Sequence, residues 1–404
     1  MSVSEALRQG TSEDAVDGVV PSQVALPESA DGLARLLADA SRRGQHTVLG
    51  GGGSKLGWGR PPARIDLAIG TSGLDRLIAH RHADLTVTVQ AGMTLVSLNR
   101  QLAEHRQFLP IDSAFAAATI GGIVATNDAG PMRHRYGTPR DSLIGVTLAM
   151  TDGRIVKAGG TVVKNVAGYD LGKLVSGSHG TLAAIVDATF KLLPIPLAST
   201  TLVASYADGK ALARDVAALH ASQVELTSFD IVSLNQERWI LLMRLASSPA
   251  ATTAQAAEAR RLLSSAPTTV NAEEENALWS EHIQAPWAGE GTVVRFSWSP
   301  SSLPAVVELL GGVSRHGCQV PVFTGRTIGA GLVRLTGEDS SIAAAITELR
   351  ASRAVGHVVV LRASRRLKEL VDVWGPPTGA NEVARVLKRT FDPANILNAG
   401  RGPI

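Results

Sequence analysis

The sequence predicts a mixed α+β fold built from more than one packing unit. Its 404 residues exceed the roughly 100 to 200 residues of an ordinary domain, so two or three packing units are expected. Amphipathic helices and alternating strands intermix in the first half. After Pro194 and Pro196 the pattern changes to long strands separated by alanine-rich helices, which indicates a boundary there.

The first half supplies recognisable helices and strands in order. A helix is expected in "PESADGLARLLADASRRG", residues 27–44, where Ser29 or Asp31 can cap and Gly44 ends the run. "QHTVLG", residues 45–50, is typical of a strand, and "DLTVTVQAG", residues 84–92, has the period of two of a half-buried strand. Thr94 then opens a second amphipathic helix.

The later chain is expected to form a hairpin and then a second αβ region. Asp152 and Gly153 separate two apolar runs, which is a strong hairpin signal. Beyond the prolines, "STTLVASY", "RWILLMRLAS" and "TVVRFSWS" indicate strands. Three alanine-rich segments are expected to be helical, and these are residues 209–221, 250–265 and 338–352. The tryptophans of this region, including Trp279, Trp287, Trp298 and Trp374, are expected in its core or at an interface.

Composition excludes several function classes. Hydrophobic residues make up 45% and charged residues 19%, which is typical of a globular chain. The net charge of +3 comes without any basic run, so nucleic acid is not an expected partner. The single cysteine, Cys318, excludes an internal disulfide and a cysteine-ligated iron-sulfur cluster carried by this chain alone. With no signal-peptide pattern and no apolar run of membrane length, a cytoplasmic protein is expected.

A glycine loop directly follows the first apolar strand. Gly50, Gly51, Gly52 and Gly53 stand in a row and are followed by Ser54. Consecutive glycines cost backbone entropy, and they allow backbone N–H groups to converge on an anion that approaches closely. We therefore expect a pyrophosphate here, the alternative being a flexible surface turn. The spacing fits neither the dinucleotide-binding glycine fingerprint nor the P-loop.

Two further stretches of small residues point to the same ligand. Between Ala114 and Ala129 nearly every residue is small, so a planar ligand could lie against the backbone. The alternative is that these small residues allow a helix to pack tightly against a strand. A third stretch, residues 159–186, mixes glycine, serine and threonine with four larger polar residues, Lys164, Asn165, Tyr169 and Asp170. Three such stretches in one domain indicate one long ligand.

These motifs resemble a known flavoprotein family. "LGGGGS", "ATIGGIVATNDAGPMRHRYGTPRDSLIGV", "TDGRIVKAGGTVVKNVAGYDLGKLVSGSHGTLAAI" and "FDPANILNAGR" are similar, in order and spacing, to the FAD-binding domain of the vanillyl-alcohol oxidase (PCMH-type) family. Within that family the chain most resembles the FAD-binding subunits E of bacterial glycolate oxidases. The resemblance implies a two-subdomain PCMH-type FAD-binding domain with an αβ cap domain. The implied ranges are an extension at 1–20, the FAD domain at 21–198, the cap at 199–375 and a segment at 376–404 that packs on the FAD domain.

The resemblance also implies which residues bind FAD. Gly50 to Ser54 would hold the pyrophosphate. Residues along the flavin and ribityl chain would be Pro110, Asp112, Thr119, Gly121, Gly122, Ala125, Thr126 and Asn127. The backbone from Gly180 to Ile185 would meet the ring or the adenine end. Covalent family members carry a histidine in the first loop, whereas this loop reads "GGGGSKLG", so non-covalent FAD is expected.

The chain departs from the family's catalytic members in its second half. Those members carry a histidine motif of the form HxGDGN, and "VFTGRTIGAGLVRL" stands here without a histidine. Arg326, Arg334, Arg362 and Arg365 could bind a carboxylate, although lone arginines are more often solvated or ion-paired. His134 and His179 are the histidines nearest the flavin-linked stretches, and a structural role is expected for each. No catalytic base and no metal site are therefore assigned.

The resemblance implies the role of an FAD-binding subunit of a glycolate oxidase (glycolate dehydrogenase) complex. The implied partners are a catalytic flavin subunit and an iron-sulfur subunit, with a small 2-hydroxy acid oxidised by the complex and membrane contact only through partners. Two alternatives stay open: a self-sufficient FAD-dependent 2-hydroxy acid dehydrogenase, and a non-redox assembly subunit.

Overall fold

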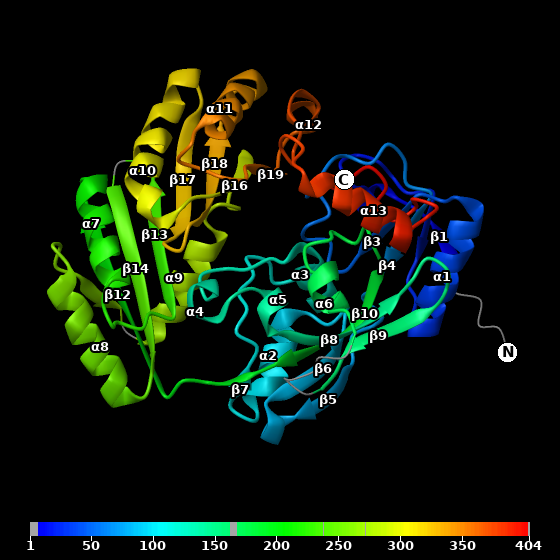
Figure 1. Ribbon diagram of the computed structural model, residues 1–404, viewed down its shortest axis with the longest axis horizontal. Coiled ribbons are helices and arrows are strands. Elements are labelled where there is room, and N and C mark those ends of the chain that lie inside the picture. The colour runs from blue at the N-terminus through cyan, green and yellow to red at the C-terminus, as the bar shows by residue number, and fades with distance from the viewer. Residues whose placement is uncertain (1–6, 162–167, 237, 271, 403–404) are drawn as a thin grey trace. The chain divides into compact units, whose positions relative to one another are not determined.

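The computed structural model describes residues 7–161, 168–236, 238–270 and 272–402 and divides them between two compact units (Figure 1). The first unit contains Met1–Ala129, Gly137–Ile195 and Pro376–Ile404. The second unit contains Pro196–Gly375 and also Gly130–Tyr136, a short excursion that the sequence assigned to the FAD domain. The chain passes between the two units at 195/196 and 375/376, and the domain ranges expected from the resemblance stay a prediction.

A four-stranded sheet and one helix form the first part of the first unit. The strands run in the order β1-β2-β4-β3, with β2, β4 and β3 parallel. Their bounds are Leu7–Gln9 for β1, Gln23–Ala25 for β2, Thr47–Gly50 for β3 and Leu67–Gly70 for β4. α1 (Ala30–Arg43) begins where the Ser29 side chain accepts a hydrogen bond from Gly32 N, and it ends at Gly44 with a φ of 61°. The expected first helix is confirmed.

A five-stranded antiparallel sheet forms the second part of this unit, in the order β5-β6-β10-β8-β9. Its bounds are Leu77–Arg81 for β5, Thr86–Gln90 for β6, Leu143–Ala149 for β8, Ile155–Gly159 for β9 and Ala184–Lys191 for β10. The hairpin expected at Asp152-Gly153 joins β8 and β9, and Gly153 has the positive φ of 89° that such turns need. The expected alternation of β6 is only partly right, because Thr86 is buried as well as Val87 and Val89.

Short helices and a small ribbon complete the first unit. They are α2 (Leu95–Ala103), α3 (Ile120–Thr126), α5 (Pro139–Ser142), α6 (Leu171–Val175) and α13 (Ala380–Phe391), with β7 (Gln107–Phe108) paired to β11 (Leu193–Pro194). Leu98 of α2 and Ile120 of α3 share one apolar core with Phe190 of β10, and all three are fully buried. This core fixes α3 against the sheet, which matters for the site below.

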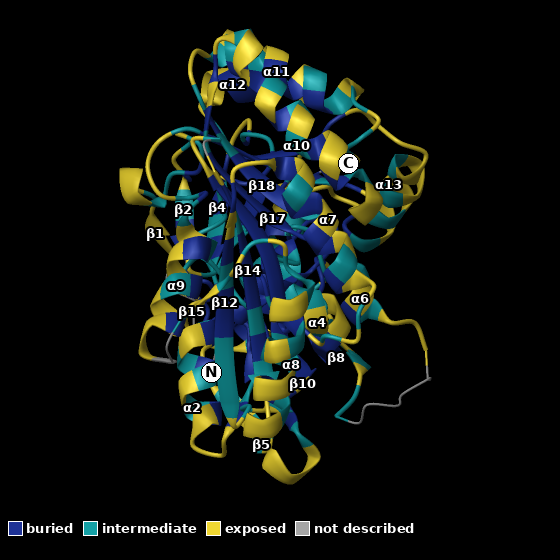
Figure 2. Ribbon diagram, turned by 90° about the vertical axis from the view of Figure 1, so that its left-hand side faces the viewer, coloured by how far each residue is buried: buried dark blue, intermediate teal, exposed yellow. Residues whose placement is uncertain are grey.

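An eight-stranded antiparallel sheet forms the second unit, in the order β15-β12-β14-β13-β17-β18-β16-β19. The bounds are Thr268–Val270 for β15, Ala198–Tyr206 for β12, Arg238–Ser247 for β14, Ser228–Leu234 for β13, Gln319–Arg326 for β17, Ala330–Thr336 for β18, Thr292–Ser297 for β16 and Val359–Arg362 for β19. Figure 2 shows β14, β17 and β18 of this sheet as largely buried. The three strands that the sequence predicted here are confirmed as β12, β14 and β16.

Helices cover both faces of this sheet. One face packs against α7 (Gly209–His220), α8 (Pro249–Leu262), α10 (Leu303–Gly312) and α11 (Asp339–Ala351). The other face packs against α9 (Ala272–Gln284), whose Trp279 lies with Val232 and Leu242. The remaining helices are α4 (Arg133–Tyr136) and α12 (Arg365–Leu370). Trp279 and Trp298 are buried, as expected of core residues, and no described helix has the length and apolarity that crossing a bilayer requires.

Candidate cofactor-binding site

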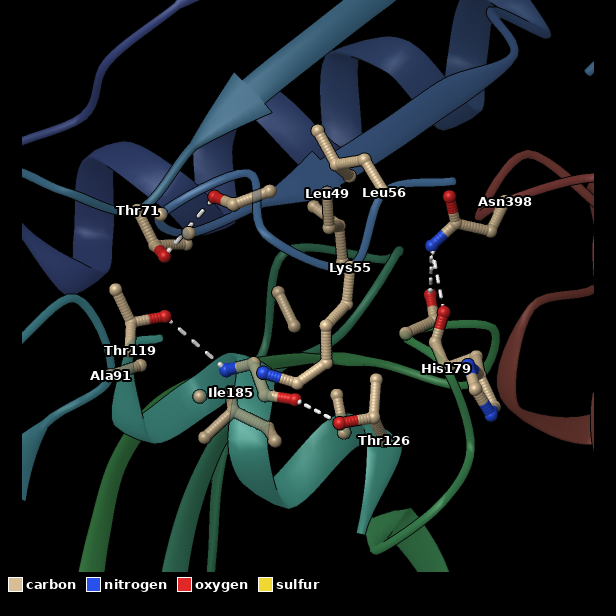
Figure 3. A pocket seen from close by; sticks show the side chains of 18 of the residues that line it. Leu49, Lys55, Leu56, Thr71, Ala91, Thr119, Thr126, His179, Ile185 and Asn398 are labelled. Atoms are coloured by element: carbon tan, nitrogen blue, oxygen red, sulfur yellow. Dashed lines mark hydrogen bonds between the residues drawn. The ribbon is translucent and has the colours of Figure 1, made fainter. Parts of the chain in front are cut away.

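The first unit contains a pocket lined by four segments that are distant in the sequence (Figure 3). They are the glycine loop after β3, α3 with the preceding Thr119, the turn before β10 and the C-terminal tail, and the single residues Thr71 and Ala91 complete the lining. The pocket holds about 860 Å³ of atom-free space, including the part that opens to solvent. Of the predicted site residues, twelve line it: Gly50, Gly51, Gly52, Gly53, Ser54, Thr119, Gly121, Gly122, Ala125, Thr126, Gly180 and Ile185.

The glycine loop is held against α3 as well as open to the pocket. A Cβ on Gly51 would overlap the Oγ1 atom of Thr119, and a Cβ on Gly52 would overlap the carbonyl oxygen of Ala117. Gly53 differs, because it has a φ of 72° and no heavy atom within 4 Å of an added Cβ. Contacts within the protein therefore already require glycine at positions 51 and 52. The sequence analysis explained these glycines only by the close approach of a ligand.

The same loop presents a run of unpaired backbone donors. Among the described residues, no hydrogen-bond acceptor is found for the N–H groups of residues 51–55. Consecutive N–H groups without protein acceptors form a concave site with partial positive charge, which suits an anion. The loop therefore fits the pyrophosphate that the sequence predicted for it.

α3 forms the wall opposite the loop. The Thr119 side chain caps the helix by accepting a hydrogen bond from Gly122 N at 3.4 Å. A Cβ on Gly121 would lie 2.8 Å from the Cβ of Ala91, so this glycine serves close packing of α3 on the end of β6. The tight packing of a helix against a strand, which was the alternative interpretation of the sequence, is thus present. Ala125 and Thr126 of the same helix also line the pocket.

The turn before β10 forms a third side of the pocket. His179 has a φ of 54°, and its N–H donates to the carbonyl oxygen of Ala125 at 2.7 Å. His179 itself lines the pocket beside Gly180. From the same sequence stretch, Tyr169 is 91% exposed and Asp170 caps α6, so neither contributes to the pocket. Lys164 and Asn165 lie outside the described residues.

The C-terminal tail also lines the pocket, through Asn398 and Arg401, and the only sequence signal for it is the family resemblance of "FDPANILNAGR". Nδ2 of Asn398 donates to the carbonyl oxygens of His179 at 2.9 Å and Gly180 at 3.3 Å. The Arg401 guanidinium donates to the carbonyl oxygens of Leu56, Trp58 and Arg60. These contacts join the tail to the two loops that flank the pocket.

Lys55 is the pocket residue that the sequence reasoning overlooked. Its side chain points into the pocket (Figure 3). The side chain is 6% exposed and forms an ion pair of 3.3 Å with Asp128. The ammonium also lies 5.2 Å from the ring centre of Phe115 and 5.9 Å from that of Trp58. Burial lowers the pKa of Lys55 from its usual 10.5, and the Asp128 carboxylate opposes that shift.

Three predicted site residues do not line the pocket. Pro110 is buried and Asp112 half-buried in the segment that precedes α3. Asn127 ends α3 with a φ of 48°, and its side-chain oxygen accepts a hydrogen bond from Arg140 N at 3.2 Å. The geometry gives Asn127 a local structural role, and a cofactor contact by these three stays a prediction.

The arginines considered for substrate binding lie in the second unit, and two are already engaged. Arg362 donates to three carbonyl oxygens between Trp287 and Gly291, and Arg365 pairs with Glu369. Arg326 is buried, with its Nε atom 3.8 Å from the Asp230 carboxylate.

The histidines and carboxylates do not gather at metal spacing. His134 packs edge-on against Phe229 of the second unit, with ring centres 5.6 Å apart. In the described ranges, no group of three or more histidine, cysteine, aspartate or glutamate side chains could hold a metal ion.

Comparison with known proteins assigns the first domain. Residues 21–159 match the model of a family described as an FAD binding domain. Solved structures of alkyldihydroxyacetonephosphate synthase match 94% of this chain and 76% of theirs, with a TM-score of 0.72 at 16% identity, which shows the fold. The expected α+β fold with a PCMH-type FAD-binding domain is confirmed, and FAD is the cofactor.

Curated relatives match over the same region. The glycolate oxidase subunit GlcD of Bacillus subtilis (strain 168) is 32% identical over 206 residues, which is 51% of this chain and 44% of that protein. The glycolate oxidase subunit GlcE of Escherichia coli (strain K12) is 35% identical over 157 residues, 38% of this chain and 44% of that protein. The mitochondrial D-lactate dehydrogenase [cytochrome] of Arabidopsis thaliana is 31% identical over 212 residues, 51% of this chain and 37% of that protein. The matched region spans less than half the length of each.

Proposed function

We propose that this chain is the FAD-binding subunit of a glycolate oxidase (glycolate dehydrogenase) complex. Such a complex oxidises glycolate to glyoxylate and passes the electrons to partner subunits, for which we propose a catalytic flavin subunit and an iron-sulfur subunit. The observation that carries the proposal is the pocket of the first unit, which is lined by residues 51–55, and the five N–H groups of these residues have no acceptor among the described residues. The two glycolate oxidase relatives named above support the choice of complex.

The residues of this chain would bind and orient the cofactor, which supplies a hydride acceptor when bound. The loop from Gly50 to Ser54 would hold its diphosphate. Thr119, Thr126 and the backbone from Gly180 to Ile185 would line its remaining length. All of these residues belong to the first compact unit.

The proposed role is tested by visible absorbance of the purified chain under anaerobic conditions. We expect a yellow protein that glycolate does not bleach by itself and that bleaches once both partner subunits are added. Bleaching of the isolated chain by glycolate would instead indicate the self-sufficient dehydrogenase, which the D-lactate dehydrogenase relative favours. A chain that binds added FAD but stays oxidised within the complex would indicate the assembly subunit and would contradict the proposal.

Non-covalent attachment is tested separately by acid precipitation. The loop that follows β3 contains no histidine, although His179 lines the pocket. We expect all of the flavin to remain in the supernatant, and flavin that stays with the pellet would show a covalent bond.

A further inference from the structure

Lys55 combines deep burial with incomplete pairing. An ammonium group has three donors and retains a strong demand for partners when it is removed from water. The Lys55 side chain is 6% exposed, and its one polar partner among the described residues is the Asp128 carboxylate at 3.3 Å. By comparison, the Lys388 side chain, which is 13% exposed, has three partners, at Thr181, Asp392 and Leu397. Lys55 therefore has capacity for a second anionic partner.

The side chains that line the pocket include two cations and no carboxylate, and the carboxylates that interact with these cations, Asp128 and Asp17, are not among the lining residues. The two cations are Lys55 and Arg401. Arg401 is committed to the carbonyl oxygens of the 56–60 loop and to Asn398. Lys55 directly follows the unpaired N–H groups of the glycine loop, so its positive charge and these donors belong to one segment.

We propose that Lys55 is the counter-ion of the FAD diphosphate and that Asp128 holds this charge in the pocket until the cofactor binds. The inference rests on the proposed cofactor site. It adds one charged side chain to a diphosphate-binding loop whose other donors are backbone N–H groups. A diphosphate carries two negative charges, which the partial charges of N–H groups balance only in part. In the FAD-free chain, Asp128 is the anionic partner of the Lys55 ammonium. When FAD binds, the Asp128 carboxylate and the diphosphate compete for this ammonium.

The two partners of the ion pair are expected to affect FAD binding in opposite directions. Lys55→Met removes the counter-ion and should weaken FAD binding about 10- to 100-fold, the range for a hydrogen bond to a charged group. Asp128→Asn removes the competing anion and should tighten FAD binding severalfold. If the ion pair only holds the loop in shape, both variants would weaken FAD binding, and this result would overturn the proposal.

The measurement is the quenching of FAD fluorescence on titration with the flavin-free full chain. Lys55→Arg keeps the charge and should stay within about threefold of the original affinity, since arginine also pairs with phosphate. Lys173→Met is the matched control, because it removes the same charge from an exposed site of the same unit. Unchanged FAD affinity in Lys55→Met would also overturn the proposal.

A second readout distinguishes the diphosphate from the flavin ring. At saturating FAD, the visible spectrum and midpoint potential of Lys55→Met should equal those of the original chain. A lowered midpoint potential would place the Lys55 charge beside the ring and would contradict the assignment. These measurements use no glycolate and no partner subunit, so their failure is distinct from a failure of the proposed function. A chain that binds no FAD at all would be recognised before any substitution is made.

Discussion

Neighbouring glycines of the first loop differ in what surrounds them. Added Cβ atoms at Gly51 and Gly52 would overlap Thr119 and the backbone of Ala117, whereas the space beside Gly53 is empty. Substitution at the first two positions would displace the loop and could not separate folding from cofactor binding. Gly53 is the position at which the approach of a ligand can be tested.

Gly53→Ala should lower FAD affinity at least about tenfold, because the added methyl group enters the pocket where the diphosphate is expected. Gly44→Ala is the matched control, since Gly44 has a similar φ of 61°, open surroundings and a place outside the pocket. Both variants should lose about 1 kcal/mol of unfolding free energy from the left-handed backbone. FAD titration measures the affinity, and urea denaturation measures the stability. Equal FAD affinities of the Gly53→Ala and Gly44→Ala variants would refute the loop assignment.

His134 predicts a pH dependence of stability in the second unit. The pKa of His134 is lowered to about 4, mainly by burial and in part by nearby His220 and Arg135, while Asp230 opposes the shift. Below its ordinary pKa of 6.5 the unfolded chain takes up the proton first, so the folded state loses stability as the pH falls from about 6.5 to about 4. The loss is at most about 1.4 kcal/mol per pH unit.

The check is urea denaturation of the full chain across this pH window. His134→Gln cannot take up the proton, so its stability should fall less steeply with decreasing pH than that of the original chain. Equal slopes would show that His134 is solvated or already protonated in the folded state.

At the scale of elements, the C-terminal segment holds the pocket together. The tail runs beside β3, where Thr47 N donates to the carbonyl oxygen of Ile396 and Asn398 N donates to that of Thr47. Lys388 of α13 donates to the carbonyl oxygens of Thr181 and Leu397 and pairs with Asp392 at 2.6 Å. One lysine therefore connects α13 with the turn before β10 and with the tail.

Lys388→Met should destabilise the first unit by about 3 kcal/mol, because it leaves the fully buried Asp392 carboxylate without its cation. FAD affinity should fall as well, since Thr181 and Leu397 adjoin the pocket residues Gly180 and Asn398. Arg389→Met on the exposed side of α13 is the control. Thermal denaturation and FAD titration provide the readouts, and an effect no larger than that of the control would contradict this role.

At the scale of the whole molecule, the cofactor pocket belongs to one of two compact units. The chain passes between the units at 129/130, 136/137, 195/196 and 375/376, so each unit is assembled from separated segments. All residues that line the pocket lie in the first unit. Each unit also has its own apolar core. Ligand binding to one unit should therefore stabilise that unit selectively.

Calorimetry of the full chain should show two unfolding transitions. FAD should raise the midpoint temperature of one of them and leave the other unchanged. At an FAD concentration about 100 times Kd, the shifted transition should gain about 2.7 kcal/mol. Comparison of scans with and without FAD makes the test. A single transition that moves as a whole would show that the two units unfold cooperatively.

The sequence by itself determined most of the secondary structure and the presence of the glycine loop. The helix capped at Ser29, the Asp152-Gly153 hairpin and the strand before Gly50 depend on periodicity and turn residues within one segment, so local patterns suffice. Only the tertiary structure revealed the pairing of Lys55 with Asp128, the contact of Gly51 with Thr119, and Asn398 and Arg401 at the pocket. It also assigned residues 130–136 to the second unit. These features arise where segments far apart in the chain pack together, and no local pattern encodes which distant partner a side chain will meet.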